Sequence, residues 1–252
     1  MKSKSEKFNQ LLERVKVDVN IIGFFLIGSR GKSFENEHSD YDPIIIVKDD
    51  LVKILKDEFM KQKSEDIDLN VMSLSEFKDY AKWGSTFAWD RYAFLHVKAI
   101  VDKTGEVQKL IEEKGLIPES ERHNFIADSL DGYINQVFRS IKCIRNNNIL
   151  GARLEASVSI PCLLDLVFAL ENRPKPFSGY LEKELKVYPL KKLPWPTDEF
   201  LQKILFILST ADIKTQQEFL KKIEILLRAE GFGKVFDEWK GKDKWAMTYN
   251  LK

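Results

Sequence analysis

Two aspartates separated by one residue, Asp40 and Asp42, stand at the start of an isoleucine-rich apolar segment. Side chains two apart in an extended chain lie on the same face, so both carboxylates should point the same way. Asp68 lies on a second short segment, in which polar and apolar residues alternate over 66–71. If the two segments are neighbouring strands, three carboxylates share one face and need cations to neutralise them. Such oxygen ligands suit Mg²⁺ that bridges to substrate phosphates.

A Gly-Ser step, Gly28-Ser29, follows a nearly continuous apolar segment, and ten residues separate it from Asp40. Such a step at the start of a loop or helix presents backbone N–H groups and a hydroxyl to a phosphate. Gly28 also lets the backbone come close, because it has no Cβ. Each feature alone is most often an ordinary loop or solvated turn. Their combination and order predict a phosphate and metal site.

The nearby Gly31-Lys32-Ser33 resembles the end of an ATPase phosphate loop. That motif needs a glycine five residues before its second glycine, and Leu26 occupies this position. A P-loop ATPase is therefore rejected.

Residue periodicity predicts the elements that must position these groups. In the first half it predicts helices over 4–17, 50–62 and 74–80, a helix ending at 114, and strands over 20–27, 41–47, 67–72 and 94–101. Beyond Pro118 the apolar spacing is helical, with helices expected over 129–146, 153–170, 177–185, 198–208 and 215–230. We therefore expect an α+β fold with one domain over 1–118 and an all-helical domain over 119–252.

Composition excludes several other classes of protein. The 40 Lys and Arg residues nearly balance the 39 Asp and Glu residues, and a net charge of +1 does not favour a nucleic-acid partner. Two cysteines are too few for a disulfide framework or a thiolate zinc site. The N-terminal residues contain no signal-peptide segment, and no apolar run could span a membrane. We expect a cytoplasmic protein with no membrane partner.

The stretch LIGSRGKSFENEHSDYDPIIIV resembles the signature of the polymerase-β-like nucleotidyltransferase superfamily. That signature is a hydrophobic residue, Gly, Gly or Ser, about ten residues, then Asp, a hydrophobic residue, and Asp or Glu. Asp68 matches the third carboxylate of the family, and 94–110 resembles the strand, turn and helix that close its catalytic domain. The length and helical second half are similar to small-molecule adenylyltransferases that modify aminoglycoside or lincosamide antibiotics. Pro43 departs from the family pattern and should lie at a sheet edge or have its backbone nitrogen unpaired.

This resemblance implies a mixed β-sheet nucleotidyltransferase domain over 1–118 and a helical substrate-binding domain over 119–252. Asp40 and Asp42 would hold two Mg²⁺ ions, and Asp68 would complete one of the sites. Gly28 and Ser29 would bind the β- and γ-phosphates of an NTP, with ATP as the default. Arg30 could contact phosphate, and an exposed loop arginine is the equally open alternative.

The helical half would supply the acceptor pocket and a base. Arg139, Lys142 and Arg145 follow helical spacing and form a basic ridge that could face the triphosphate, or else a solvated face. Glu155 could take the proton of the acceptor, and an ion pair with Arg153 or a neighbouring residue is the open alternative. The nucleotide-binding prediction therefore includes Arg139 and Lys142, and the catalytic prediction includes Glu155.

The leading hypothesis is an enzyme that transfers an NMP from an NTP to a hydroxyl of a small molecule, an aminoglycoside-like antibiotic being one candidate. Transfer to a protein or RNA acceptor is the first alternative. A catalytically silent nucleotide-binding regulator is the second, although the intact Asp40, Asp42 and Asp68 argue against it. The sequence names neither the acceptor nor the oligomeric state, and a homodimer stays open.

Overall fold

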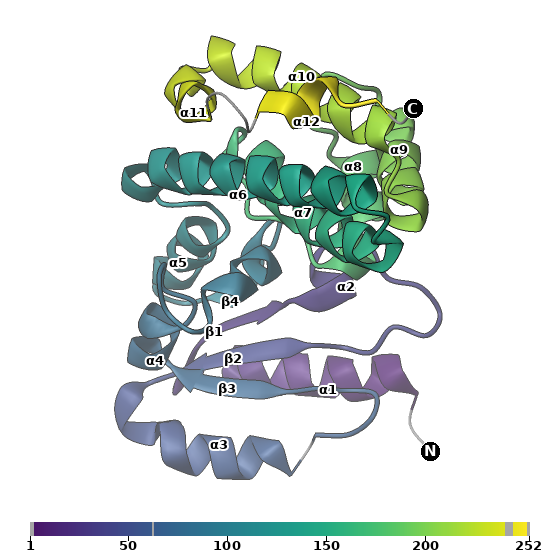
Figure 1. Cartoon of the computed structure of the whole chain (residues 1–252). Coiled ribbons are helices and arrows are strands. Elements are labelled where there is room, and N and C mark those ends of the chain that lie inside the picture. The colour runs from purple at the N-terminus through teal and green to yellow at the C-terminus, as the bar shows by residue number, and fades with distance from the viewer. Residues whose placement is uncertain (1–2, 62, 240–243, 251–252) are drawn as a thin grey trace. The chain divides into compact units, whose positions relative to one another are not determined.

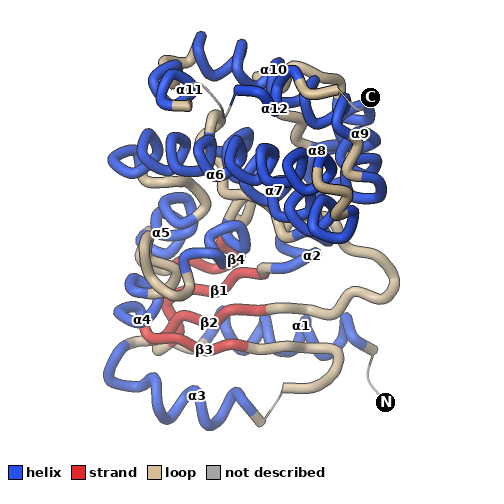
Figure 2. Tube along the Cα trace, viewed as in Figure 1, coloured by secondary structure: helices blue, strands red, loops and turns tan. Residues whose placement is uncertain are grey.

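The computed structural model describes residues 3–61, 63–239 and 244–250. The chain divides into two compact units, 1–118 and 119–252, at the residue where the sequence pattern becomes helical. The fold is α+β, with a four-stranded mixed sheet in the first unit (Figure 1). In the second unit, the regular structure of the described residues is helical (Figure 2).

The sheet has the strand order β3-β2-β1-β4. Its strands are β1 (Ile21–Leu26), β2 (Pro43–Val47), β3 (Asn70–Ser73) and β4 (Ala99–Asp102). β1 runs antiparallel to both β2 and β4, whereas β2 and β3 are parallel. The two inner strands have side chains buried on both faces, which explains why they read as continuous apolar runs.

Helices cover both faces of this sheet. On one face, Leu11 of α1 (Lys4–Val17) and Phe59 of α3 (Val52–Met60) belong to the same buried cluster as Phe24 of β1. The adjacent residue of β1, Phe25, points to the other face, where its ring centroid lies 5.4 Å from that of Phe77 in α4 (Leu74–Asp79). A 3₁₀-helix, η1 (Asp49–Leu51), leads into α3, and α5 (Glu106–Lys114) follows β4. The strand alternation of β1 thus joins two apolar layers.

The expected strand over 94–101 is wrong in its first half. Ala88–Phe94 forms a 3₁₀-helix, η2, and a turn at His96 with φ of +66° precedes β4. The buried ammonium of Lys32 accounts for this, because its Nζ donates to the carbonyls of Tyr92 at 2.7 Å and Leu95 at 2.5 Å. Of the two, the carbonyl of Leu95 lies in the expected strand and binds the lysine instead of a neighbouring strand.

The helical unit is built around two long helices that pack against each other, α6 (Glu119–Arg145) and α7 (Ile149–Ala169). The remaining elements are η3 (Ser178–Tyr180), α8 (Leu181–Val187), α9 (Thr197–Thr210), α10 (Ile213–Ala229), α11 (Gly233–Glu238) and α12 (Trp245–Thr248). α6 begins ten residues before the helix expected over 129–146, and α11 and α12 were not predicted. None of the described helices is long and apolar enough to cross a membrane.

Gly23 allows α5 to approach β1 closely, because a Cβ at this position would lie 2.6 Å from Cγ2 of Val107. We expect Gly23→Ala to lower the free energy of unfolding by about 1–3 kcal/mol, as overpacked core positions do. Chemical denaturation of Gly23→Ala, Val107→Ala and the double variant checks this contact. The double variant should be less destabilised than the sum of the single variants. Strictly additive effects would exclude the contact as the cause.

Candidate active site

The Gly-Ser step and the second aspartate of the motif meet in the structure. β1 leads through Ile27 into α2 (Gly28–Gly31), and Gly28 has φ of +63°. A Cβ on Gly28 would lie 2.2 Å from Oδ2 of Asp42, so only glycine leaves room for this carboxylate. The backbone N–H of Ile27 also donates to the carbonyl oxygen of Asp42 at 3.0 Å. Residues fourteen positions apart in the sequence thus form one local site.

Backbone pairing with a neighbouring loop holds the segment that carries both aspartates. The N–H of Tyr41 donates to the carbonyl of Asp66 at 3.0 Å, and the N–H of Asp68 donates to the carbonyl of Tyr41 at 2.8 Å. Asp40 and Asp42 precede β2, and Asp68 precedes β3, so all three carboxylates lie just outside the regular strands. The expectation that the strands begin at 41 and 67 was therefore wrong by two or three residues.

Pro43 stands at the first position of β2, which is an inner strand. Of the two expected alternatives, the edge position is excluded and the unpaired backbone nitrogen remains. A strand can begin with proline because the missing N–H falls at the end of the ladder. The proline therefore marks the change from the carboxylate-bearing segment to the regular sheet.

The surroundings of Asp42 oppose its negative charge. Burial is the main cause, with repulsion by Asp40 and then Asp68 added, and together they raise the pKa of Asp42 from 3.8 to about 6. Burial disfavours an ionised carboxylate because it removes water, and like charges add to the penalty. Asp42 is thus a carboxylate that a bound cation would stabilise.

Asp68 has a different environment, although it is close enough to influence Asp42. Its side chain is exposed, and its Oδ1 lies 2.5 Å from Nζ of Lys63. Among the described residues, no three His, Cys, Asp or Glu side chains are gathered around a point that could hold a metal ion. The predicted set of Asp40, Asp42 and Asp68 therefore shares an electrostatic field without forming a three-ligand cluster.

Two cationic side chains of the Gly-Ser loop contact backbone carbonyls. Arg30 donates from Nε to the carbonyl of Asp40 at 2.8 Å and from Nη2 to that of Ser39 at 3.1 Å. Lys32, which sequence reasoning considered only as part of a rejected motif, is 2% exposed and ties this loop to η2. A lysine buried against carbonyls gives no local sequence signal. Ser29 is buried in α2, and its phosphate role, like that of Arg30, stays a prediction.

The residues predicted in the helical unit include one pair in direct contact. Nη2 and Nε of Arg139 on α6 lie 2.8 and 2.9 Å from Oε1 of Glu155 on α7. Glu155 thus forms an ion pair, as the open alternative expected, but its partner is Arg139 of α6 and not Arg153 or a residue beside it. Arg145 of the same ridge lies over the ring of Trp245, with its Cζ 4.2 Å from the centroid, and Lys142 is exposed. The roles of Arg139, Lys142 and Glu155 with substrate stay predictions.

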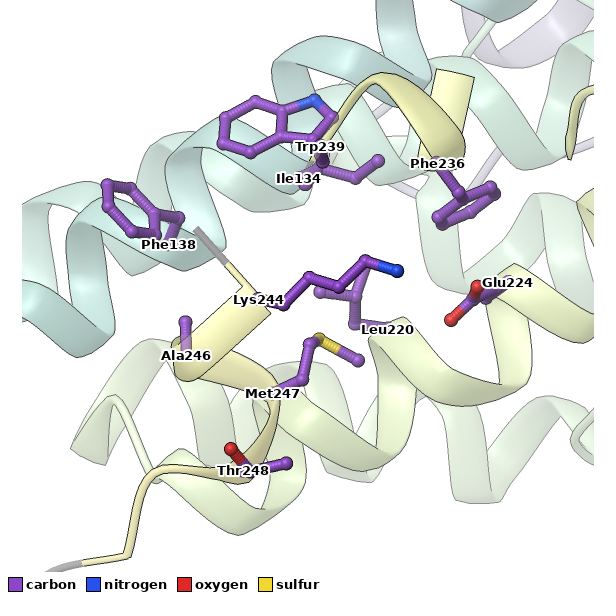
Figure 3. A pocket seen from close by; sticks show the side chains of 10 residues that line it. All are labelled: Ile134, Phe138, Leu220, Glu224, Phe236, Trp239, Lys244, Ala246, Met247 and Thr248. Carbon is purple, nitrogen blue, oxygen red and sulfur yellow. The ribbon is translucent and has the colours of Figure 1, made fainter. Parts of the chain in front are cut away.

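A cavity of about 240 Å³ lies within the helical unit. Its lining is mainly apolar and aromatic, with one carboxylate and one ammonium (Figure 3): Ile134, Phe138, Leu220, Glu224, Phe236, Trp239, Lys244, Ala246, Met247 and Thr248. Sequence reasoning did not find these residues, because they come from separate helices and meet only in the folded unit.

Comparison with known proteins finds no related sequence and a weak structural similarity. No protein-family profile and no curated protein sequence matches the chain. A solved structure of a nucleotidyltransferase-like protein from Exiguobacterium sibiricum is similar over 88% of this chain and 79% of its own chain. The sequence identity is 11% and the TM-score is 0.39. This likeness is too weak to support an argument about function, which depends on the residues themselves.

The raised pKa of Asp42 predicts a pH-dependent effect of Asp42→Asn. The unfolded carboxyl ionises near pH 3.8 and the folded one near pH 6, so the ionised native state loses stability between these values. Asp42→Asn should therefore be more stable than the wild type at pH 7.5, by about 1 kcal/mol after allowance for solvent screening. The advantage should disappear near pH 4. Urea unfolding at both pH values measures it.

Asp66→Asn is a matched control with the opposite sign. A hydrogen bond from Lys7 is the main cause of the lowered pKa of Asp66, so its ionised form stabilises the fold. Its replacement should destabilise the protein at pH 7.5, and this effect should fade as the pH falls through the lowered pKa. If Asp42→Asn were less stable than the wild type at pH 7.5, the account of Asp42 would be wrong.

Proposed function

We propose that this chain is a Mg²⁺-dependent nucleotidyltransferase that moves an NMP, by default AMP, from an NTP to a hydroxyl of a small molecule and releases pyrophosphate. One observation carries the proposal. Asp42, two residues after Asp40, lies against Gly28, which follows the inner strand β1. Its surroundings there disfavour the ionised carboxylate. This joins the two halves of the sequence motif in one site.

The chemistry of the side chains fits Mg²⁺. Asp40 and Asp42 would hold the metal through hard carboxylate oxygens, which Mg²⁺ prefers. The repulsion that raises the pKa of Asp42 is what a divalent cation would relieve. Asp68 would join them once its ion pair with Lys63 breaks. That ion pair is exposed, and such pairs contribute little to stability. Bound Mg²⁺ would supply charge neutralisation for an in-line displacement at the α-phosphorus.

The protein's own part in the reaction is to bind and orient. Gly28 and Ser29 would contact the β- and γ-phosphates, which the backbone can approach because Gly28 has no side chain. Asp68, the most exposed of the three carboxylates, would lie near the attacking hydroxyl. Such positioning of substrates carries most of the catalysis in phosphoryl-transfer chemistry. We propose Glu155 as the base that takes the proton from the attacking hydroxyl, after its ion pair with Arg139 breaks.

The proposal of a small-molecule acceptor depends on the helical second unit and on the near-neutral net charge of +1. An RNA acceptor would call for a basic surface, which the composition does not favour. Aminoglycoside and lincosamide antibiotics carry the required hydroxyls and are the first class to test.

We expect Asp40→Asn and Asp42→Asn each to reduce turnover by a factor of about 10² or more, because each removes a charge that acts on the metal. Pyrophosphate release with Mg²⁺ and each of the four NTPs, over a panel of aminoglycosides and lincosamides, measures this. Asp66→Asn, in the adjoining loop and already paired with Lys7, is the control and should keep its turnover per folded molecule.

Several outcomes would contradict the proposal. Turnover near that of the wild type in Asp42→Asn would exclude the carboxylate site. Labelling of protein or RNA alone would replace the small-molecule acceptor with a macromolecular one. Nucleotide binding with no transfer to any acceptor would indicate a silent regulator.

A further inference from the structure

The guanidinium of Arg30 is engaged with the backbone that carries the aspartates. Nε donates to the carbonyl of Asp40 at 2.8 Å and Nη2 donates to the carbonyl of Ser39 at 3.1 Å. A guanidinium is a rigid planar fork, so two such bonds fix both the distance and the orientation of the two peptide groups. Arg30 therefore connects α2 to the segment that immediately precedes Asp42.

The same guanidinium also packs on the side chain between the two aspartates. Its Cζ lies 4.0 Å from the centroid of the Tyr41 ring. The ring of Phe8 in α1 stacks on Tyr41, with centroids 4.3 Å apart and planes at 12°. Tyr41 is thus fixed by an arginine and by a partly buried aromatic contact. Because Asp40 and Asp42 are its immediate neighbours, fixing Tyr41 restricts both of them.

We propose that Arg30 is a positioning residue, which holds residues 39–41 so that Asp42 keeps its place against Gly28 and Asp40 keeps its place two residues before it. It acts through these aspartates and does not act as a ligand of the triphosphate. The consequence for catalysis rests on the proposed nucleotidyl transfer, whereas the positioning itself rests only on the contacts of Arg30. Lysine retains the charge but has no planar fork, so Arg30→Lys separates positioning from charge.

Amide hydrogen exchange tests the positioning without any need for activity. The N–H of Asp68 donates to the carbonyl of Tyr41, so it reports how firmly the segment is held. In Arg30→Lys we expect this amide to exchange about tenfold faster, because a local opening becomes easier. The amides within β1 and β2 should keep their wild-type rates.

Arg14→Lys is a matched control. The Cζ of Arg14 also lies 4.0 Å from an aromatic centroid, that of Phe59, and its Nη2 lies 2.6 Å from Glu58. Neither of these partners belongs to residues 39–41. Arg14→Lys should leave the exchange of the Asp68 amide unchanged. If Arg30→Lys also left it unchanged, or if both variants accelerated it equally, positioning by Arg30 would be overturned.

Kinetics and binding supply a second readout. Positioning predicts that Arg30→Lys lowers kcat, with little change in KM for the NTP and in the affinity for ATP measured with a chelator. A direct phosphate contact predicts a different pattern. Arg30→Lys, which keeps the charge, would then have near-normal kcat and ATP binding, and Arg30→Met, which loses the charge, would bind ATP weakly. That second pattern would overturn the proposal. If the wild type transferred no nucleotide, the proposed function would fail, and hydrogen exchange would still decide the role of Arg30.

Discussion

The partial burial of one carboxylate, Asp42, in the field of two others is the constraint on which the rest of the candidate site depends. Asp42 is ionised only against desolvation and the charges of Asp40 and Asp68, which raise its pKa to about 6. Such a group persists where the surrounding structure fixes it. Gly28 leaves the space for it, the N–H of Ile27 binds its carbonyl, and Arg30 holds the preceding peptides. A charged group that is kept in an unfavourable electrostatic environment by the contacts around it is typical of functional sites.

Much of the fold could be predicted from the sequence, because local patterns determine it. The same holds for the part of the site formed by the Gly-Ser step and the two aspartates that follow it. The helix expected over 4–17 is confirmed as α1, and the helix expected over 74–80 is confirmed as α4, which Ser73 caps in a capping box. The Gly28 and Asp42 pair could be named from spacing and family resemblance. The strand expected over 94–101 is absent over its first five residues, where η2 ends at Phe94 and the carbonyl of Leu95 accepts from Lys32, a residue 63 positions away. The lining of the helical cavity also depends on tertiary contacts, because its residues come from separate helices.

In the helical unit, Arg139 and Glu155 have two candidate roles, one in substrate binding or catalysis and one in packing. The contact of Arg139 with Glu155 joins α6 to α7, so the same two side chains that could serve substrate also contribute to packing. A partly exposed ion pair of this kind is worth about 0.2–1 kcal/mol, which a ligand can readily replace. The aromatic cavity in this unit involves other residues altogether. The division of labour proposed here therefore places the metal chemistry in the first unit and assigns acceptor recognition to the second.

The most direct test of the central claim is a crystal structure of the chain with Mn²⁺ and a nonhydrolysable ATP analogue, with the metal located by its anomalous signal. Mn²⁺ accepts the same oxygen ligands as Mg²⁺ and is visible in such maps. The account predicts metal coordinated by both Asp40 and Asp42, with the triphosphate against Gly28 and Ser29. Metal and triphosphate bound elsewhere, with the carboxylate of Asp42 free of metal, would contradict it.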